Sequence, residues 1–296
     1  MFKGSCVALV TPFKNGRVDE SKLRELVDFH VKAGTSAIVP CGSTGESATL
    51  SHAEHIRVVE VVVRASRGRI PVIAGTGSNS TTETVSLTRR AKAAGADAAL
   101  VIVPYYNKPS QEGMVQHFTA VAQAVSLPLF IYNIPSRTGV NLLPATLARI
   151  AAANRNIAGV KESSGNLEQI SEVAHLFASR KDFTLLSGDD SLTLPVLAVG
   201  GRGVISVLAN IAPKDVQELC TSALGGDWAK ARRLASKAFP LVRALFVETN
   251  PAPVKTAMEH LKLCSGEMRL PMCQLRPENK ALLLRAIKTY GLRKAR

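Results

Sequence analysis

Up to about residue 224, the chain alternates between two hydrophobic patterns. Short apolar runs, typical of buried strands, are separated by longer segments whose apolar residues recur with helical spacing. The predicted strands are Ser5–Val10, Ser36–Pro40, Ile70–Ala74, Ala98–Val103, Pro128–Tyr132, Ile157–Lys161, Phe183–Ser187 and Gly203–Ser206. The helices predicted between them are Ser21–Ala33, His52–Ser66, Thr81–Ala94, Gln111–Ala124, Pro144–Ala152, Leu167–Ala178, Ser191–Val199 and Pro213–Ala223. Eight strand–helix units in series predict an α/β fold, a (β/α)8 TIM barrel.

The strand pattern stops after Gly225-Gly226, and only helical patterns follow. These helices are predicted over Asp227–Val247, Ala252–Leu263 and Pro277–Tyr290. We therefore predict a catalytic barrel over residues 1–224 and a C-terminal α-helical extension over residues 225–296. An open doubly wound sheet is the alternative, but no G-x-G-x-x-G fingerprint follows the first strand. Ser51 with Glu54, and Ser80 with Glu83, predict capping boxes at two helix starts.

The composition is that of an ordinary globular protein, with 46% hydrophobic and 20% charged residues in 296. The N-terminal residues do not resemble a signal peptide, and no uncharged apolar run is long enough to cross a bilayer. The five cysteines are scattered without a C-x-x-C pair. They favour buried thiols in a reducing cytoplasm over disulfides or zinc. His52 and His55 lack the H-E-x-x-H order, so we expect no metal.

The formal net charge of +14 raises the question of nucleic-acid binding. The basic residues are spread over many predicted helices, aromatic residues make up only 5%, and the one basic cluster is Arg293-Lys294-Arg296. Dispersed charge of this kind usually forms a solvated surface. We expect neither nucleic acid nor membrane as a partner, although a positive field would attract small anionic substrates.

The stretch from Asn156 to Gly165 has an unusual pattern, because its apolar run ends in a lysine, Lys161. Small polar residues follow at once, as where a buried strand opens into a loop. Burying an ammonium group is costly, and burial generally lowers the pKa of a lysine. A neutral amine can form a Schiff base with a carbonyl substrate. The alternative is a lysine that extends its amine into solvent from the strand end.

Polar residues also follow other predicted strands. The segments are Cys41–Glu46, Pro104–Pro109, Tyr132–Gly139 and Gly188–Asp190. The active site of a TIM barrel lies at the C-terminal ends of its strands, so phenols, an arginine and Lys161 should meet on one rim. The first segment could offer N–H groups to a carboxylate, or it could be a plain tight turn. A tyrosine at a strand end is also often a core residue with a solvated tip.

Four motifs at these strand ends carry a resemblance that covers essentially the whole chain. They are Gly42-Ser43-Thr44-Gly45-Glu46, Tyr132-Asn133-Ile134-Pro135-Ser136-Arg137-Thr138-Gly139, Gly159-Val160-Lys161-Glu162 and Gly188-Asp189-Asp190. Together they resemble the pyruvate-dependent class I aldolases of the N-acetylneuraminate lyase superfamily. The resemblance implies a (β/α)8 barrel with a helical extension, and a homotetramer built as a dimer of dimers. It implies no cofactor, because pyruvate itself is bound as a Schiff base on Lys161.

The resemblance also implies roles for individual residues. Lys161 would form the Schiff base and Tyr132 would carry protons, through a relay with Ser43 and with Tyr106 from a neighbouring subunit. Substrate would be bound by Thr44, Arg137, Gly188 and Ile205. In the family branch closest to this chain, threonine is more common where this chain has Ser43. The hydroxyl is kept, but the χ1 of serine is less restricted than that of a β-branched residue.

Arg137 favours one branch of the family, because sialic-acid lyases typically lack an arginine there. That branch condenses pyruvate with L-aspartate 4-semialdehyde, releases water and closes a six-membered heterocycle on the route to diaminopimelate and lysine. A related 2-oxo-acid aldolase with another aldehyde, or a non-catalytic basic binding protein, are the alternatives. L-lysine is expected as a feedback inhibitor at a subunit interface. The matching positions are Ser47, Ala48, His52, His55, Asn79, Glu83 and Tyr105.

Overall fold

The computed structural model describes residues 2–294 and contains one large parallel sheet. Its strands follow the order β4-β1-β10-β9-β8-β7-β6-β5. They are β1 (Gly4–Ala8), β4 (Ala37–Val39), β5 (Ile73–Gly75), β6 (Ala98–Ile102), β7 (Leu129–Asn133), β8 (Ile157–Glu162), β9 (Thr184–Ser187) and β10 (Gly203–Ser206). A parallel bridge between Ile38 and Val72 joins the two outer strands. The sheet therefore closes, and the predicted (β/α)8 barrel is confirmed.

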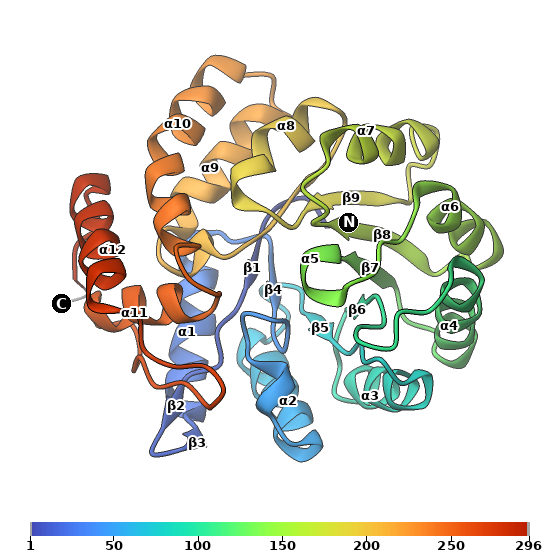
Figure 1. The fold of residues 1–296 in the computed structure, drawn as a ribbon, viewed down its shortest axis with the longest axis horizontal. Coiled ribbons are helices and arrows are strands. Elements are labelled where there is room, and N and C mark those ends of the chain that lie inside the picture. The colour runs from blue at the N-terminus through green and yellow to red at the C-terminus, as the bar shows by residue number, and fades with distance from the viewer. Residues whose placement is uncertain (1, 295–296) are drawn as a thin grey trace.

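Helices surround this barrel, as Figure 1 shows. They are α1 (Glu20–Ala33), α2 (His52–Ser66), α3 (Thr81–Ala93), α4 (Gln111–Ala124), α6 (Pro144–Ala153), α7 (Leu167–Leu176), α8 (Thr193–Ala198) and α9 (Pro213–Leu224). Apolar residues line the space between strands and helices, which is the larger part of the core. Each crossover helix thus covers the outer face of the sheet, as parallel sheets require.

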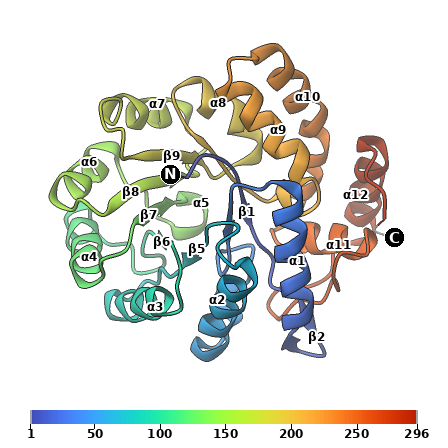
Figure 2. The same cartoon turned by 180° about the vertical axis from the view of Figure 1, so that it is seen from behind.

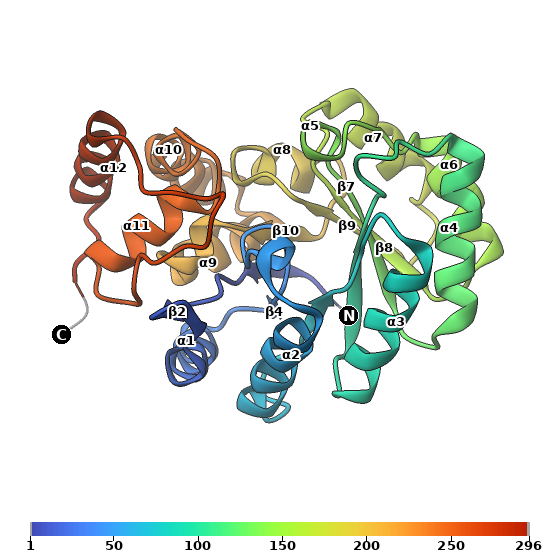
Figure 3. The ribbon, with the colours of Figure 1, turned by 60° about the horizontal axis from the view of Figure 1, so that its bottom comes forward.

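The three predicted C-terminal helices are also present: α10 (Trp228–Leu245), α11 (Ala252–His260) and α12 (Pro277–Tyr290). They gather on one side of the barrel, and α11 lies beside α1 and the short strand β2 (Phe13–Lys14) in Figure 3. The loop after α11 contacts that region directly, because Glu267 accepts hydrogen bonds from the N–H groups of Asn15 and Gly16. The extension is therefore packed against the N-terminal part of the barrel.

The structure corrects two local predictions. The third strand begins at Ile73 instead of Ile70, because Pro71 has no N–H and Val72 donates its own to Asp97 Oδ2 at 2.8 Å. The capping box at Ser51 is present, but that at Ser80 is only half formed. Ser80 N donates to Ser78 Oγ rather than to Glu83, whose carboxylate bonds elsewhere.

Several short elements were not predicted. The hairpin strands β2 (Phe13–Lys14) and β3 (Arg17–Val18) precede α1, and the single-turn helix α5 (Pro135–Thr138) follows β7. The other short elements are the 3-10 turns Ser47–Thr49, Asp190–Leu192 and Leu208–Asn210. All six elements lie in loops that follow barrel strands, at the C-terminal rim, where these loops need compact folds of their own.

The barrel interior forms a separate small cluster of apolar side chains. Phe2 belongs to it, and its ring packs edge-on against that of Phe130 with centroids 5.3 Å apart. Figure 2 shows the barrel from behind, with β1 leading into the ring of strands. Because Phe2 precedes β1, it fills the barrel from the end where the strands begin.

Among residues 2–294, no helix is both long and apolar enough to cross a bilayer. Arg293 and Lys294 of the basic cluster are exposed, and Arg296 lies outside the described residues.

Candidate active site

Lys161 lies near the end of β8, directly across from Tyr132 on β7 in the strand register. Its Nζ is 4.0 Å from the centroid of the Tyr132 ring. Both residues are buried, with 7% and 5% of their surfaces exposed. Within residues 2–294, this amine has no hydrogen bond and no carboxylate partner. The ring face is its one polar contact, which leaves the amine available for chemistry.

Gly188, just after β9, makes room for the side chain of Lys161. A Cβ at position 188 would lie 2.8 Å from Lys161 Cε and would overlap Ser163 Oγ. The sequence therefore needs glycine here because the lysine side chain occupies the space. The Ser163 hydroxyl is buried and has no partner in the described part of the chain. The sequence analysis did not single out Ser163.

A cavity of about 370 Å³ opens beside this pair at the C-terminal rim of the barrel. Ser43, Tyr132 and Arg137 all line it, so the structure brings three predicted residues together. Arg137 projects from α5, which Gly139 ends in the left-handed conformation at φ 73°. Its Nη2 donates to the carbonyl of Asn250 at 2.9 Å. The rest of the guanidinium can bind a carboxylate.

The segment Cys41–Glu46 forms a tight turn in the cavity wall. Gly42 O accepts from Gly45 N at 3.1 Å, and a Cβ on Gly45 would lie 3.1 Å from the Leu9 carbonyl oxygen. The N–H groups of Ser43 and Thr44 donate to nothing within residues 2–294. Two free N–H groups in a turn can bind an anionic group. This agrees with the prediction that the turn could offer N–H groups to a carboxylate.

Glu162 and Asn133 follow Lys161 and Tyr132, and they pair on the opposite face of the same two strands. Asn133 Nδ2 donates to Glu162 Oε2 at 3.0 Å, and Ser164 N donates to Oε1 at 2.7 Å. Burial raises the pKa of the Glu162 carboxyl, although these hydrogen bonds oppose the shift. This network was missed, because a single Asn or Glu in a strand gives no signal of its partner.

The comparisons with known proteins agree with this geometry. Residues 1–290 match the Dihydrodipicolinate synthetase family. A 4-hydroxy-tetrahydrodipicolinate synthase from Geobacter sulfurreducens is 54% identical over 292 residues, which are 99% of this chain and 100% of the relative.

The chain belongs to the dihydrodipicolinate synthetase family. The predicted lyase-type activity, 4-hydroxy-tetrahydrodipicolinate synthesis in lysine biosynthesis, is confirmed by this full-length homology.

Two solved dihydrodipicolinate synthases carry small molecules. A chloride-inhibited enzyme from Acinetobacter baumannii, complexed with pyruvate, is 44% identical with a TM-score of 0.95, covering 99% of this chain and 100% of that one. An enzyme from Cyanidioschyzon merolae with lysine bound is 40% identical with a TM-score of 0.95, covering 98% and 99%. The barrel of this chain is thus the barrel of the dihydrodipicolinate synthetase family.

Other predicted residues lie apart from the cavity wall. The Tyr106 side chain is 88% exposed, and its backbone is left-handed at φ 72°. Ile205 is buried within β10, opposite Cys6 on β1. Thr44 is buried, and its Oγ1 accepts from Asn250 Nδ2 at 2.9 Å. An exposed aromatic side chain held in an uncommon backbone conformation is suited to contact another molecule.

Most positions that match the family's lysine site line the same cavity. They are Ser47, Ala48, His52, His55, Glu83 and Tyr105. Hydrogen bonds from Ser78 and His52 lower the pKa of the Glu83 carboxyl, the first more than the second. His55 Nε2 donates to Gly75 O at 2.7 Å, and burial lowers the pKa of this imidazole. Asn79 lies outside the wall, where its carbonyl accepts from Asn107 Nδ2 at 2.9 Å.

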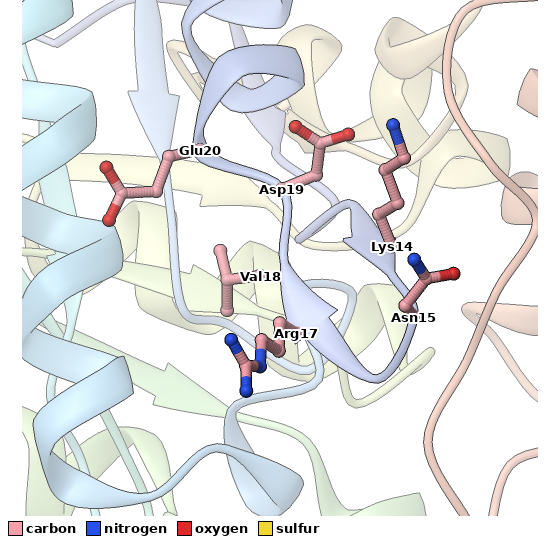
Figure 4. A pocket seen from close by; sticks show the side chains of 6 residues that line it. All are labelled: Lys14, Asn15, Arg17, Val18, Asp19 and Glu20. Atoms are coloured by element: carbon pink, nitrogen blue, oxygen red, sulfur yellow. The ribbon is translucent and has the colours of Figure 1, made fainter.

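A larger hollow, of about 620 Å³, lies beside the β2–β3 hairpin. Figure 4 shows that its six side chains splay apart instead of converging. Its carboxylates already have partners: Asp19 caps α1, and Glu20 accepts from Arg57 Nε at 2.6 Å. The smaller cavity at the barrel rim, which Ser43, Tyr132 and Arg137 line, is therefore the better candidate for the active site.

Proposed function

We propose that Lys161 performs the condensation through a Schiff base. The observation that carries this proposal is the buried Lys161 amine, against the Tyr132 ring and without a carboxylate partner within residues 2–294. The amine attacks the keto carbon of pyruvate, and loss of water gives an imine. The imine draws electrons from the methyl group, which loses a proton and becomes a nucleophilic enamine carbon.

The enamine carbon then attacks the aldehyde of L-aspartate 4-semialdehyde, and the aldehyde oxygen takes up a proton. The amino group of that substrate next attacks the imine carbon. This step releases the Lys161 amine and closes the six-membered ring. One water is lost overall, and the lysine returns unchanged.

Tyr132 carries the protons in this scheme as general base and acid. Its place beside Lys161, in one cavity with Ser43, supports this role. The relay is completed by Tyr106 of a neighbouring subunit, and the 88% exposure of this side chain supports a partner there. We accordingly propose a homotetramer, assembled as a dimer of dimers.

The two substrates are held by different groups. The free N–H groups of Ser43 and Thr44 bind the pyruvate carboxylate, while Gly188 and Ile205 line the site through their backbone carbonyls. Arg137 binds the carboxylate of the semialdehyde as a two-pronged donor. The pyruvate-bound relative from Acinetobacter baumannii supports pyruvate as the first substrate.

L-lysine is the proposed inhibitor of the enzyme, and it would bind at its own set of residues. Glu83 would oppose its side-chain ammonium, Asn79 and Tyr105 would bond its carboxylate, and His55 would close over its stem. The lysine-bound relative from Cyanidioschyzon merolae supports the ligand. The shared cavity supports a short route from this site to Tyr132.

Residues 1–224 act as the catalytic barrel in this proposal, and residues 225–296 as the helical domain. The cytoplasm is the proposed location. The five cysteines are free thiols, four of them buried, which suits a reducing compartment.

Borohydride trapping tests the Schiff base. Incubation with pyruvate and borohydride should add one reduced pyruvyl group to Lys161 and inactivate the enzyme, because reduction makes the imine linkage permanent. Intact-mass and peptide analysis measure the adduct, with Lys161→Met as the control that should gain none. An adduct on another lysine, or none in the wild type, would contradict the proposal.

A further inference from the structure

A second buried lysine, Lys255 in α11, lies beneath the turn that lines the active site. Its side chain is fully buried, and Nζ donates to Glu46 Oε1 at 2.5 Å. Nζ also lies 4.2 Å from the centroid of the Phe13 ring. The two partners are 209 residues apart in the chain, so this ion pair joins the helical extension to the barrel rim.

Glu46 ends the turn whose free N–H groups belong to Ser43 and Thr44. It lines the cavity, and its backbone is left-handed at φ 55°. Its N–H donates to Ser43 O at 3.2 Å, and its second carboxylate oxygen accepts from Arg269 N at 3.2 Å. Two groups of the extension therefore hold the carboxylate that closes this turn.

The same extension reaches the turn at another point. Asn250 Nδ2 donates to Thr44 Oγ1 at 2.9 Å, and its carbonyl accepts from Arg137 Nη2 at 2.9 Å. The segment from Asn250 to Arg269 thus touches the groups proposed for both substrate carboxylates.

The charges in this region explain why Lys255 matters. Glu46 places a carboxylate three residues beyond Ser43, in the wall of a cavity that must accept an anion. Like charges that face each other cost several kcal/mol when they are poorly solvated. The ammonium of Lys255 cancels that charge and fixes the carboxylate behind the turn.

We propose that Lys255 is a positioning residue for pyruvate. It acts through Glu46, by keeping the Ser43–Thr44 turn in shape and by balancing the charge beneath it. The inference rests on the proposed role of this turn in binding the pyruvate carboxylate. It gives the helical extension a direct part in substrate binding.

Steady-state kinetics of Lys255→Met test this inference. The KM for pyruvate should rise roughly ten-fold or more, because Glu46 is left as an uncompensated anion, while kcat falls less. The double variant Glu46→Gln/Lys255→Met removes both charges and keeps the shapes. It should return the KM for pyruvate to within about three-fold of the wild type.

Tyr290→Phe is the structural control. It removes the hydrogen bond that Tyr290 donates to Asp215 in another part of the extension, at 2.5 Å. Its stability should fall while its KM for pyruvate stays at the wild-type value. A rise in KM for this variant as large as that for Lys255→Met would overturn the inference, since general loosening would then explain both.

Glu46→Asp covers the case in which Lys255→Met does not fold. It keeps both charges but withdraws the carboxylate from Lys255 and from Arg269 N, so the KM for pyruvate should rise about three-fold. A wild-type KM for pyruvate in Lys255→Met, or in Glu46→Asp where Lys255→Met does not fold, overturns the inference. A double variant whose KM is no lower than that of Lys255→Met overturns it as well. Trapping of pyruvate on Lys161 of the wild type tests the proposed function separately, so the two failures are distinguishable.

Discussion

Lys161 in the barrel and Lys255 in the helical extension are both buried, yet their surroundings differ. Lys255 faces a carboxylate that the fold supplies, and the pair is fully enclosed. Lys161 faces the ring of Tyr132, which lines the cavity, and it has no carboxylate partner within residues 2–294. Taking a charged group out of water costs several kcal/mol unless a partner compensates it.

The difference separates two uses of the same side chain. At Lys255 the protein itself supplies the charged partner, the Glu46 carboxylate. Burial lowers the pKa of the Lys255 amine, and the Glu46 carboxylate opposes this shift. At Lys161 the fold supplies no such partner within residues 2–294, and in the proposed function pyruvate binds this amine covalently. A buried lysine without an internal partner thus indicates a role in a reaction, whereas a paired one indicates a role in holding other groups in place.

Breaking the paired lysine should have the largest effect on stability. Lys255→Met should lower the free energy of unfolding by about 3–5 kcal/mol, because Glu46 stays buried without its cation. Lys161→Met should change it by less than about 1 kcal/mol, since no carboxylate is left behind. Urea unfolding of both variants and of the wild type measures this contrast. Equal losses of unfolding free energy in the two variants would mean that the carboxylate partner of Lys255 makes no difference to stability.

Arg137 extends the comparison to a cation in the cavity wall. Within residues 2–294 its side chain makes one hydrogen bond, to Asn250 O. Arg137→Ala should weaken kcat/KM for the semialdehyde by about 2–5 kcal/mol, because the carboxylate loses its two donors. Pyruvate should still be trapped on Lys161. Arg57→Ala, in an exposed pair with Glu20, serves as the matched control and should leave both steps intact. Equal loss of both steps in Arg137→Ala would mean that this residue shapes the site.

Glu83 extends the comparison to an acid, because its carboxylate is partly exposed and, within the described part of the chain, bonds only His52 and Ser78. Wild-type enzyme should be partially inhibited by L-lysine. Glu83→Ala should need a roughly ten-fold higher concentration of L-lysine for the same inhibition, since a charge-assisted hydrogen bond is lost. Glu60→Ala on α2 is the control, expected to behave as the wild type. Equal inhibition of wild type and Glu83→Ala would place the inhibitor elsewhere.

Glu162 is a buried acid with no cationic partner among residues 2–294, in contrast to Glu46, which pairs with Lys255. Its raised pKa means that the native state keeps this proton to higher pH than the unfolded state, whose carboxyl titrates near 4.5. The native state then binds more protons, and its stability falls as pH rises from about 4.5 through the raised pKa. Glu162→Gln has no titrating carboxyl at this position, so it lacks this pH dependence of stability. Its stability relative to the wild type should therefore improve over that range, by at most about 1.4 kcal/mol per pH unit.

Urea unfolding at a series of pH values from acid to neutral measures this trend. Glu112→Gln provides a control of opposite sign, because Arg149 lowers the pKa of that exposed carboxyl. The relative stability of this second variant should decline as pH rises. A flat difference for Glu162→Gln would show that the buried carboxyl titrates as it does in the unfolded chain.

Local patterns were enough to predict the barrel and its rim. Each strand is a contiguous apolar run, and the barrel topology sends every strand end to one side, so Lys161, Tyr132 and Ser43 could be placed together. The start of the third strand was misplaced because hydrophobicity alone extends through Ile70 and Pro71. The ladder needs N–H groups, and proline has none.

Pairings between distant residues could not be predicted in this way. Lys255 sits in an ordinary helical stretch, and nothing near it in the sequence points to Glu46. The hairpin at Phe13–Val18 has strands of only two residues each, too short for a pattern to appear. Such contacts depend on how the closed barrel brings the extension back to its rim.

Phe2 has a consequence for the order of events in catalysis. Because this ring fills the barrel from the end where the strands begin, we expect substrates to reach the reacting centre from the rim, where Ser43 and Arg137 line the cavity. Lys161 is buried and Arg137 is exposed, so in the proposed function a molecule held by the arginine would block the path to the lysine. We therefore expect pyruvate to enter first and the finished ring to leave before the next pyruvate arrives.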